Sequence, residues 1–263
     1  MDLQGVNVLI TGASRGLGRE LAVCFAAAGA TPVLVARDEL GLAQVAAQTG
    51  GLPLAADLSD PAVVRTLWAR AEAAAGPIAV LVNNAGIVEA GDFADCEHDA
   101  ITRTLQVNVL APVHLCRDAA ASMQARSGGH LVNVSSLAAV APLPGLATYS
   151  TSKAALSHFT RALAVELAGL PIGTTLVELG PVPTDMAEQV TQHHPASASF
   201  DRLFALRLLS ATPAATAAAA VVHAVQSGRP HVRLPRRAAG FGVLAAAPSA
   251  AVRLALTGVP RRA

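Results

Sequence analysis

The segment VNVLITGASRGLG, residues 6–18, joins an apolar run to a glycine-rich loop and then to a helical pattern. Gly12, Gly16 and Gly18 permit a tight turn and a close backbone approach to a pyrophosphate, and the free amides at a helix N-terminus bind an anion. An ordinary strand–turn–helix connection is the alternative for a lone loop of this kind. The residues expected to contact a dinucleotide are Gly12, Ser14, Arg15, Gly16, Leu17 and Gly18.

Apolar strand-like runs alternate with longer helical patterns along the rest of the chain. The strand-like runs are Val6–Ile10, Pro32–Ala36, Leu52–Ala55, Ile78–Val82, His130–Val134, Gly173–Glu178 and His231–Leu234. The helical patterns include Gly16–Ala28, Pro61–Ala75, Asp99–Ala125 and Tyr149–Ala168. This alternation predicts an α/β fold, with a doubly wound parallel sheet of about seven strands and helices on both faces. Ligands of such a fold bind beyond the carboxyl ends of the strands.

The composition favours one domain that binds small molecules. The chain has 263 residues, of which 52% are apolar, so a well-buried core is within reach. We expect a single domain over residues 1–235, followed by an apolar tail over 236–263 that is not a separate domain. Only 14% of the residues are charged and the net charge is +1, which leaves no field to attract nucleic acid.

Neither the cysteines nor the histidines predict a metal site. Cys24, Cys96 and Cys116 lack metal-ligand spacing and are interpreted as reduced thiols. His193 and His194 are adjacent and no third ligand follows, so we expect them to be loop residues. No bound metal is expected.

The sequence also gives no sign of export or of a membrane span. No basic segment precedes the first apolar run, so an export signal is not predicted. The longest run without charged residues, 127–152, contains Asn133, Pro142 and Pro144, which argue against a membrane helix. We therefore expect a cytoplasmic protein.

The residues at the end of the second strand-like run should determine which cofactor is bound. An acidic residue there would bind an adenosine 2′-hydroxyl and repel a 2′-phosphate, but this chain has Ala36-Arg37. Arg37 and Arg15 offer two guanidinium groups to a phosphate, which favours NADP(H) over NAD(H), although two solvated arginines are the alternative. Asp57, which precedes Leu58, is placed either to meet the adenine amino group or to start a helix.

Tyr149 and Lys153 are the only tyrosine and the only lysine of the chain. Positions i and i+4 share one helical face, so the ammonium can favour the ionised phenol and draw its pKa down from ~10. The pair therefore predicts a general acid or base at Tyr149. Ser136, at the end of the fifth strand-like run, can hydrogen-bond the same substrate oxygen, or it is a turn serine.

Taken together, six motifs resemble the short-chain dehydrogenase/reductase family in order and spacing. They are Thr11–Gly18, Asn83-Asn84-Ala85-Gly86, Asn108, Ser135-Ser136, Tyr149-Ser-Thr-Ser-Lys153 and Gly180-Pro181-Val182-Pro183-Thr184. The resemblance covers about residues 5–234 and implies a Rossmann fold in one domain. Where the family usually has Pro-Gly, this chain has Leu179-Gly180, so the path of that loop stays open.

The resemblance also implies roles for individual residues. Tyr149 would donate the proton in reduction, with Ser136 orienting the carbonyl. Lys153 would hold the nicotinamide ribose as well as tune the phenol, and Asn108 would hold a water that joins Lys153 to solvent. In addition to the glycine loop and Arg37, the expected cofactor contacts are Asp57, Leu58, Asn84, Ala85, Gly86, Tyr149, Lys153, Val182 and Thr184.

Two apolar segments, Ala138–Leu146 and 186–209, indicate that the substrate is hydrophobic. Neither contains Arg or Lys before Arg202, which favours a hydrophobic carbonyl compound or secondary alcohol. The second segment is interpreted as a packed helix, and in the resembling family it is the substrate lid. We expect reversible hydride transfer with NADP(H). The alternatives are an NAD-dependent alcohol dehydrogenase, a 3-oxoacyl-carrier-protein reductase and a dinucleotide-sensing protein without catalysis.

Self-association and the tail complete the expectations. The helical patterns Asp99–Ala125 and Tyr149–Ala168 carry few charges, and the resembling family commonly associates through them, so a homodimer or homotetramer is expected. Pro248 divides the tail into halves that are each too short to span a bilayer. We favour docking of the tail on the body or on a neighbouring subunit over contact with a membrane surface.

Overall fold

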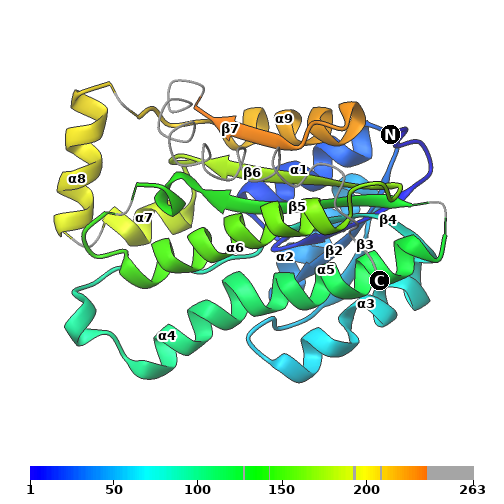
Figure 1. Cartoon of the computed structure of the whole chain (residues 1–263), viewed down its shortest axis with the longest axis horizontal. Coiled ribbons are helices and arrows are strands. Elements are labelled where there is room, and N and C mark those ends of the chain that lie inside the picture. Colours follow the sequence, from blue (N-terminus) through cyan, green and yellow to red (C-terminus); the bar gives the residue numbers. More distant parts are fainter. Residues whose placement is uncertain (127, 142, 192–193, 208, 236–263) are drawn as a thin grey trace.

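The computed structural model describes residues 1–126, 128–141, 143–191, 194–207 and 209–235. These residues form one sheet of seven parallel strands in the order β3-β2-β1-β4-β5-β6-β7 (Figure 1), which confirms the predicted doubly wound α/β fold in a single domain. The strands are β1 (Asn7–Thr11), β2 (Thr31–Ala36), β3 (Leu52–Ala55), β4 (Ile78–Asn83), β5 (Gly129–Ser136), β6 (Ile172–Leu179) and β7 (His231–Leu234). The winding reverses between β1 and β4, which opens a crevice at their carboxyl ends.

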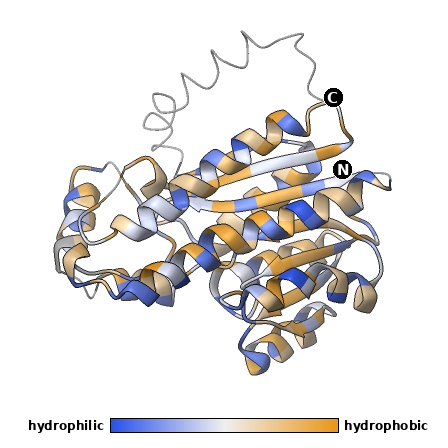
Figure 2. Cartoon of the chain, turned by 60° about the horizontal axis from the view of Figure 1, so that its bottom comes forward, coloured by the Kyte–Doolittle hydropathy of each residue, from blue (hydrophilic) through white to orange (hydrophobic). Residues whose placement is uncertain are grey.

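Helices cover both faces of this sheet. They are α1 (Gly16–Ala27), α2 (Glu39–Thr49), α3 (Pro61–Ala75), α4 (His98–Leu105), α5 (Ala111–Gln124), α6 (Ala147–Glu166), α7 (Asp185–Thr191), α8 (His194–Ala205) and α9 (Ala214–Ser227). One core, which contains Phe25, Leu34 and Val221, packs α1, α2 and α9 against the sheet. The core on the other face joins α3, α5 and α6 to it, with Leu81 and Leu115 fully buried. Figure 2 shows the apolar strands between these helical layers.

Local signals fix where several helices begin and end. The Asp38 carboxylate accepts a hydrogen bond from the Gly41 amide at 3.1 Å, and that of Asp60 accepts one from Ala62 at 2.7 Å, so each caps the helix that follows it. Gly50, with a φ of 67°, ends α2 in the left-handed conformation that glycine adopts without strain.

The structure corrects two details of the expected elements. The predicted helix over Asp99–Ala125 is interrupted by a π-helical turn, Gln106–Leu110, so that α4 and α5 are separate. His194 is the first residue of α8, so the prediction of a loop there is wrong, whereas His193 lies outside the described residues. The tail over residues 236–263 also lies outside them, and the predictions made for it stay predictions.

The apolar segment that follows β6 forms α7 and α8. These helices lie at one end of the molecule, beyond the carboxyl ends of the strands (Figure 1). None of the helices in the described ranges combines the length and the apolarity needed to span a bilayer.

Candidate active site

A cavity of about 1390 Å³ lies at the carboxyl ends of the strands, between the glycine-rich loop and helices α7 and α8. The predicted site residues that line it are Gly12, Ser14, Arg15, Gly16, Leu17, Gly18, Arg37, Asp57, Leu58, Asn84, Ala85, Gly86, Ser136, Tyr149, Lys153, Val182 and Thr184. Asn108 does not line the cavity and is fully buried. The structure therefore brings together residues that lie as far apart in the sequence as Gly12 and Thr184.

The glycine-rich loop leaves no room for a side chain at Gly12 or Gly18. A Cβ at Gly18 would lie 2.0 Å from the Gly12 carbonyl oxygen, and one at Gly12 would lie 2.9 Å from the Cα of Ala85. Gly12 and Gly16 have φ values of 68° and 54°, in the region that favours glycine. At these glycines, the loop between β1 and α1 therefore presents its backbone to the cavity.

Thr11 holds this loop against the end of β4, a role that the sequence reasoning missed. Its hydroxyl accepts hydrogen bonds from the amides of Asn84 and Ala85, both at 3.0 Å. The Asn84 side chain returns to the loop by donating to the carbonyl oxygens of Thr11 at 2.9 Å and Gly12 at 3.3 Å. A hydroxyl residue that ends the first strand was the available signal in the sequence.

The end of the cavity near Arg37, where the sequence analysis predicts a nucleotide and which is called the nucleotide end below, carries exposed charge. Arg37 Nη1 lies 4.0 Å from Asp57 Oδ2, and 67% of the Arg37 side chain is exposed. Asp57 accepts hydrogen bonds from the Ser59 amide at 2.9 Å and hydroxyl at 2.8 Å, whereas Asp60 caps α3, so the helix-start interpretation of Asp57 is wrong. Burial raises the pKa of the Asp57 carboxyl, but the Ser59 hydrogen bonds and the Arg37 charge outweigh it, and the net pKa is lowered.

Arg15 joins the glycine-rich loop to the start of α7. Its Nη1 donates to Asp185 Oδ2 at 2.6 Å, and both side chains are mostly exposed. A Cβ at Gly16 would lie 3.2 Å from Thr184 Cγ2, so the loop and the segment before α7 are in close contact. The sequence analysis did not predict this ion pair.

The opposite end of the cavity holds the half-buried Tyr149 and the buried Lys153. Lys153 Nζ lies 5.9 Å from the centroid of the Tyr149 ring and donates to the Val134 carbonyl at 3.0 Å. Burial lowers the pKa of Lys153 to about 8. Burial also raises the pKa of Tyr149, and a hydrogen bond with Ser136 opposes that rise. The predicted lowering of the Tyr149 pKa is therefore not seen, because burial dominates and Lys153 points to Val134.

Asn108 lies in the π-helical turn and uses both ends of its amide. Its Oδ1 accepts from the Ile87 amide at 2.8 Å, and its Nδ2 donates to the Ile87 carbonyl at 2.9 Å and to Ser152 Oγ at 3.0 Å. A Cβ at Gly86 would lie 3.3 Å from Lys153 Nζ. The hydrogen bonds between Asn108 and Ile87 therefore hold the segment that contains Gly86 next to the lysine. Such turns occur often at functional sites. The water expected at Asn108 stays a prediction.

Apolar side chains surround Tyr149 on the side of α7 and α8. The members of this cluster are Val88, Leu146, Val190 and Ala196, with Ala90, Leu143, Tyr149, Met186 and Phe200 packed against them. Charged residues also line the cavity: Glu89 and Arg103 come from other segments, whereas Asp185 belongs to α7 and Asp201 to α8. Arg103 and Glu89 form an ion pair with each other. In the described ranges, no three His, Cys, Asp or Glu side chains gather as metal ligands.

A glycine-rich loop at the switch point of a doubly wound sheet defines a protein of the Rossmann class. Residues 6–195 match the sequence model of the family described as short chain dehydrogenase. The probable oxidoreductase EphD of Mycobacterium tuberculosis is 37% identical over 238 residues, a match that covers 85% of this chain and 40% of EphD. The chain thus spans about 40% of the length of that relative. It belongs to the short-chain dehydrogenase/reductase family of oxidoreductases.

Solved structures of similar fold agree. A blue fluorescent protein from a metagenomic library, in complex with NADPH, is 30% identical with a TM-score of 0.77 and coverage of 91% of this chain and 100% of that one. The 3-ketoacyl-(acyl-carrier-protein) reductase of Brucella melitensis, complexed with NADH, is 27% identical with a TM-score of 0.80 and coverage of 90% and 99%. This chain therefore resembles solved structures over nearly all of its described part.

Proposed function

We propose that this protein catalyses reversible hydride transfer between NADP(H) and a hydrophobic carbonyl compound or secondary alcohol, with Tyr149 as the general acid or base. One observation carries the proposal: a single cavity joins the glycine-rich loop to a half-buried tyrosine that lies beside Ser136 and Lys153. A loop of this kind binds a pyrophosphate, and a phenol next to a cation transfers a proton.

The residues present fit a nicotinamide dinucleotide. The space that a Cβ at Gly18 or Gly12 would need is taken by backbone, so at these two positions the loop can offer only its main chain to a phosphate. At one end of the cavity, the residues that would hold the dinucleotide are Gly12, Ser14, Arg15, Gly16, Leu17, Gly18, Arg37, Asp57 and Leu58. At the other end they are Asn84, Ala85, Gly86, Lys153, Val182 and Thr184. The nicotinamide, when bound, supplies or accepts the hydride. The similar structures with NADPH and NADH support this cofactor class.

The charges at the end of β2 support NADP(H) as the preferred form. Ala36 places no carboxylate at the strand end, and the next acidic residue, Asp38, caps α2 with its side chain. Arg37 and Arg15 both line the cavity with exposed guanidinium groups. Two such groups bind a phosphate dianion through charge-assisted hydrogen bonds, which a 2′-hydroxyl cannot offer.

The proton-transfer step follows from three side chains. Because the pKa of Tyr149 is raised, its phenol is neutral near pH 7 and can donate a proton to a substrate oxygen in reduction. Ser136 Oγ accepts a hydrogen bond from the Ala138 amide at 3.1 Å, which leaves the hydroxyl proton for the substrate oxygen or for Tyr149. Lys153 stays an ammonium below about pH 8, so a positive charge lies 5.9 Å from the centroid of the ring that gives up the proton.

The apolar cluster around Tyr149 supports a hydrophobic substrate. Leu143, Met186 and Phe200 face the same cavity as the tyrosine, and a charged substrate would lose its hydration there. Reduction is the expected direction in a cytoplasmic setting, because cytosolic NADP pools usually favour it. We further propose a homodimer or homotetramer formed through α4, α5 and α6, and no binding of nucleic acid.

A panel of ketones tests the proposal with NADPH and NADH in parallel. We expect kcat/KM to be at least about tenfold higher with NADPH, the effect of one charge-assisted phosphate contact. Apolar ketones should react faster than keto acids, and a 3-oxoacyl thioester belongs in the panel to test the carrier-protein alternative. A preference for NADH would contradict the role given to the arginines. Tight dinucleotide binding without turnover of any ketone or alcohol would instead favour a sensing protein.

A further inference from the structure

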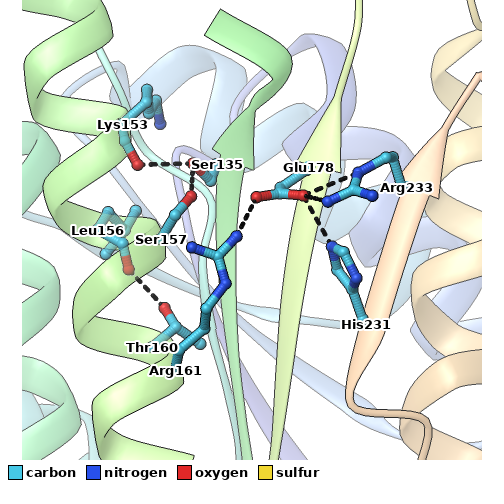
Figure 3. Close-up of polar contacts among 9 residues, drawn as sticks. All are labelled: Ser135, Lys153, Leu156, Ser157, Thr160, Arg161, Glu178, His231 and Arg233. Atoms are coloured by element: carbon cyan, nitrogen blue, oxygen red, sulfur yellow. Dashed lines mark hydrogen bonds and ion pairs between the residues drawn. The ribbon is translucent and has the colours of Figure 1, made fainter. Parts of the chain in front are cut away.

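A hydrogen-bonded pair of serines connects β5 to α6, the helix that carries Tyr149 and Lys153 and is called the catalytic helix below. Ser135 Oγ donates to the backbone carbonyl of Lys153 at 2.9 Å and lies 2.7 Å from Ser157 Oγ (Figure 3). A hydroxyl has one proton, and that of Ser135 is used for Lys153, so Ser157 donates to Ser135. Both serines are buried, with 4% and 1% of their surface exposed. Removing the Ser135 hydroxyl therefore leaves the buried Ser157 hydroxyl without this acceptor, whereas removing the Ser157 hydroxyl leaves Ser135 its bond to Lys153.

Three consecutive residues of β5 contact the catalytic helix or line the cavity. The carbonyl of Val134 accepts from the ammonium of Lys153 at 3.0 Å, and the side chain of Ser135 holds the backbone of the same lysine. The next residue, Ser136, lines the cavity and hydrogen-bonds Tyr149. Lys153 is consequently held at its backbone and at its side-chain end by the strand that also carries Ser136.

Other contacts hold α6 to the sheet farther along the helix. Asn133 Nδ2 donates to Thr160 Oγ1 at 3.0 Å. Arg161 Nη2 donates to Glu178 Oε1 at 2.7 Å, as Figure 3 shows. Thr160 lies seven residues beyond Lys153, which is about 10 Å along the helix. These contacts therefore secure the helix as a whole, whereas the Ser135 contact lies at the level of the reacting groups.

We propose that Ser135, supported by Ser157, is a positioning residue that fixes Lys153 and Tyr149 relative to Ser136. Tyr149 lies one helical turn before Lys153, so a shift or rotation of α6 at Lys153 moves the phenol away from Ser136. Catalytic geometry is sensitive to displacements on the order of 1 Å. The kinetic part of this inference rests on the proposed function, and its structural part does not.

Kinetics with NADPH and a ketone test the kinetic part. Ser135→Ala should lower kcat by about 10- to 100-fold while the KM for NADPH stays within about threefold, because the contacts offered by the glycine-rich loop and Arg37 are untouched. Ser135→Thr keeps the hydroxyl and should restore most of kcat. Thr160→Val is the matched control, since it removes a buried hydrogen bond between the same strand and helix. It should lower the melting temperature without a comparable loss of kcat, and an equal loss of kcat in both variants would overturn the proposal.

The single lysine and the single tyrosine allow a second test that needs no substrate. Protein labelled with ¹³Cε-lysine and ¹³Cζ-tyrosine gives one NMR signal for Lys153 and one for Tyr149. At a fixed pH, Ser135→Ala should shift both signals, Ser157→Ala should shift them less, and Thr160→Val should leave them at the wild-type positions. Wild-type positions in Ser135→Ala, or equal shifts in Thr160→Val, would overturn the proposal whether or not the enzyme reduces ketones.

Discussion

The charged side chains are buried in one region of the molecule and exposed in another. The first region is the layer between β5, β6 and α6, and the second is the nucleotide end of the cavity. In the buried layer, Glu178 is fully enclosed and Lys153 is 4% exposed, and both have pKa values far from their usual range. At the nucleotide end, Arg15 and Arg37 are 71% and 67% exposed, and their ion pairs lie at the surface. Exposed ion pairs contribute little to the stability of the fold and are screened by salt, whereas a buried charge is strongly destabilising when it loses a partner.

This contrast separates chemistry from cofactor choice. Substitutions in the buried layer should cost activity or stability by large factors, because no water replaces a lost partner. Substitutions at the nucleotide end should change the preference between two cofactors by smaller factors and leave the reaction intact.

Lys153→Arg should have the largest effect of the variants at the two regions. The planar guanidinium is larger than the ammonium and cannot occupy the buried space between the Val134 carbonyl and Gly86. We expect kcat to fall by at least about 100-fold, the lower range for loss of acid–base catalysis. Steady-state reduction of a ketone checks this, with the exposed exchange Arg117→Lys as the control. A Lys153→Arg enzyme with near wild-type kcat would remove the distinction between the regions.

Glu178→Gln should lower stability in a way that depends on pH. Burial raises the pKa of this carboxyl, but hydrogen bonds from His231 and Arg233 and their charges hold it at about 2, below the ordinary 4.5. The carboxylate therefore stabilises the fold above about pH 4.5, and this contribution is lost as the pH falls toward 2. We expect the free energy of unfolding at pH 7 to drop by about 3 kcal/mol.

Urea unfolding of Glu178→Gln and wild type at pH 7 and pH 3 measures this difference. The gap between the two proteins should narrow at pH 3, where the wild type begins to lose the same contribution. The exposed carboxylate Asp185 provides the control, because Asp185→Asn should change stability little at either pH. A Glu178→Gln protein as stable as Asp185→Asn at pH 7 would contradict the account of the buried layer.

Arg37→Asp should change cofactor preference and leave the reaction in place. The variant loses a phosphate contact and adds repulsion, so KM for NADPH should rise by about 10- to 100-fold. KM for NADH should change far less, and kcat at saturating cofactor should be kept within about threefold. Initial rates over a range of both cofactors check the prediction. A parallel rise of KM for both cofactors would show that Arg37 supports the fold of the loop instead.

Asp185→Asn should have the smallest effect, and in the opposite direction. Asp185 pairs with Arg15 at 2.6 Å and so competes with a 2′-phosphate for the same guanidinium. Removing its charge should lower KM for NADPH by about two- to fivefold at low salt, the range for an exposed ion pair, and leave KM for NADH unchanged. The gain should vanish near 1 M salt. A gain that persists at high salt would contradict an electrostatic cause.

The sequence predicted the fold because its strands are buried on both faces and appear as continuous apolar runs. Val33, Leu34 and Val35 of β2 are fully buried, as a parallel strand between two helical layers requires. Helix α2 was not identified, although Asp38 and Gly50 mark its two ends. The π-helical turn at Gln106–Leu110 could not be predicted, since its hydropathy pattern is that of a continuous helix.

The residues that line the cavity were predicted where they belong to fixed motifs, whereas the contacts between two distant segments were missed. Arg15 and Asp185 are 170 positions apart, and no local pattern announces their contact. The roles of Thr11 and Ser135 depend on which backbone groups lie opposite their hydroxyls in the packed structure. The direction of the Tyr149 pKa failed for the same reason, because burial by α7 and α8 is a tertiary property.

The direct test of the central claim is the reduction of an apolar ketone by Tyr149→Phe, measured beside calorimetric binding of NADPH. The phenylalanine ring keeps the shape of the site and removes only the group that carries the proton. We expect NADPH to bind with wild-type affinity, and kcat to fall by about 10²- to 10⁴-fold or more. A Tyr149→Phe enzyme that binds NADPH and retains most of the wild-type kcat would contradict the assignment of Tyr149 as the general acid.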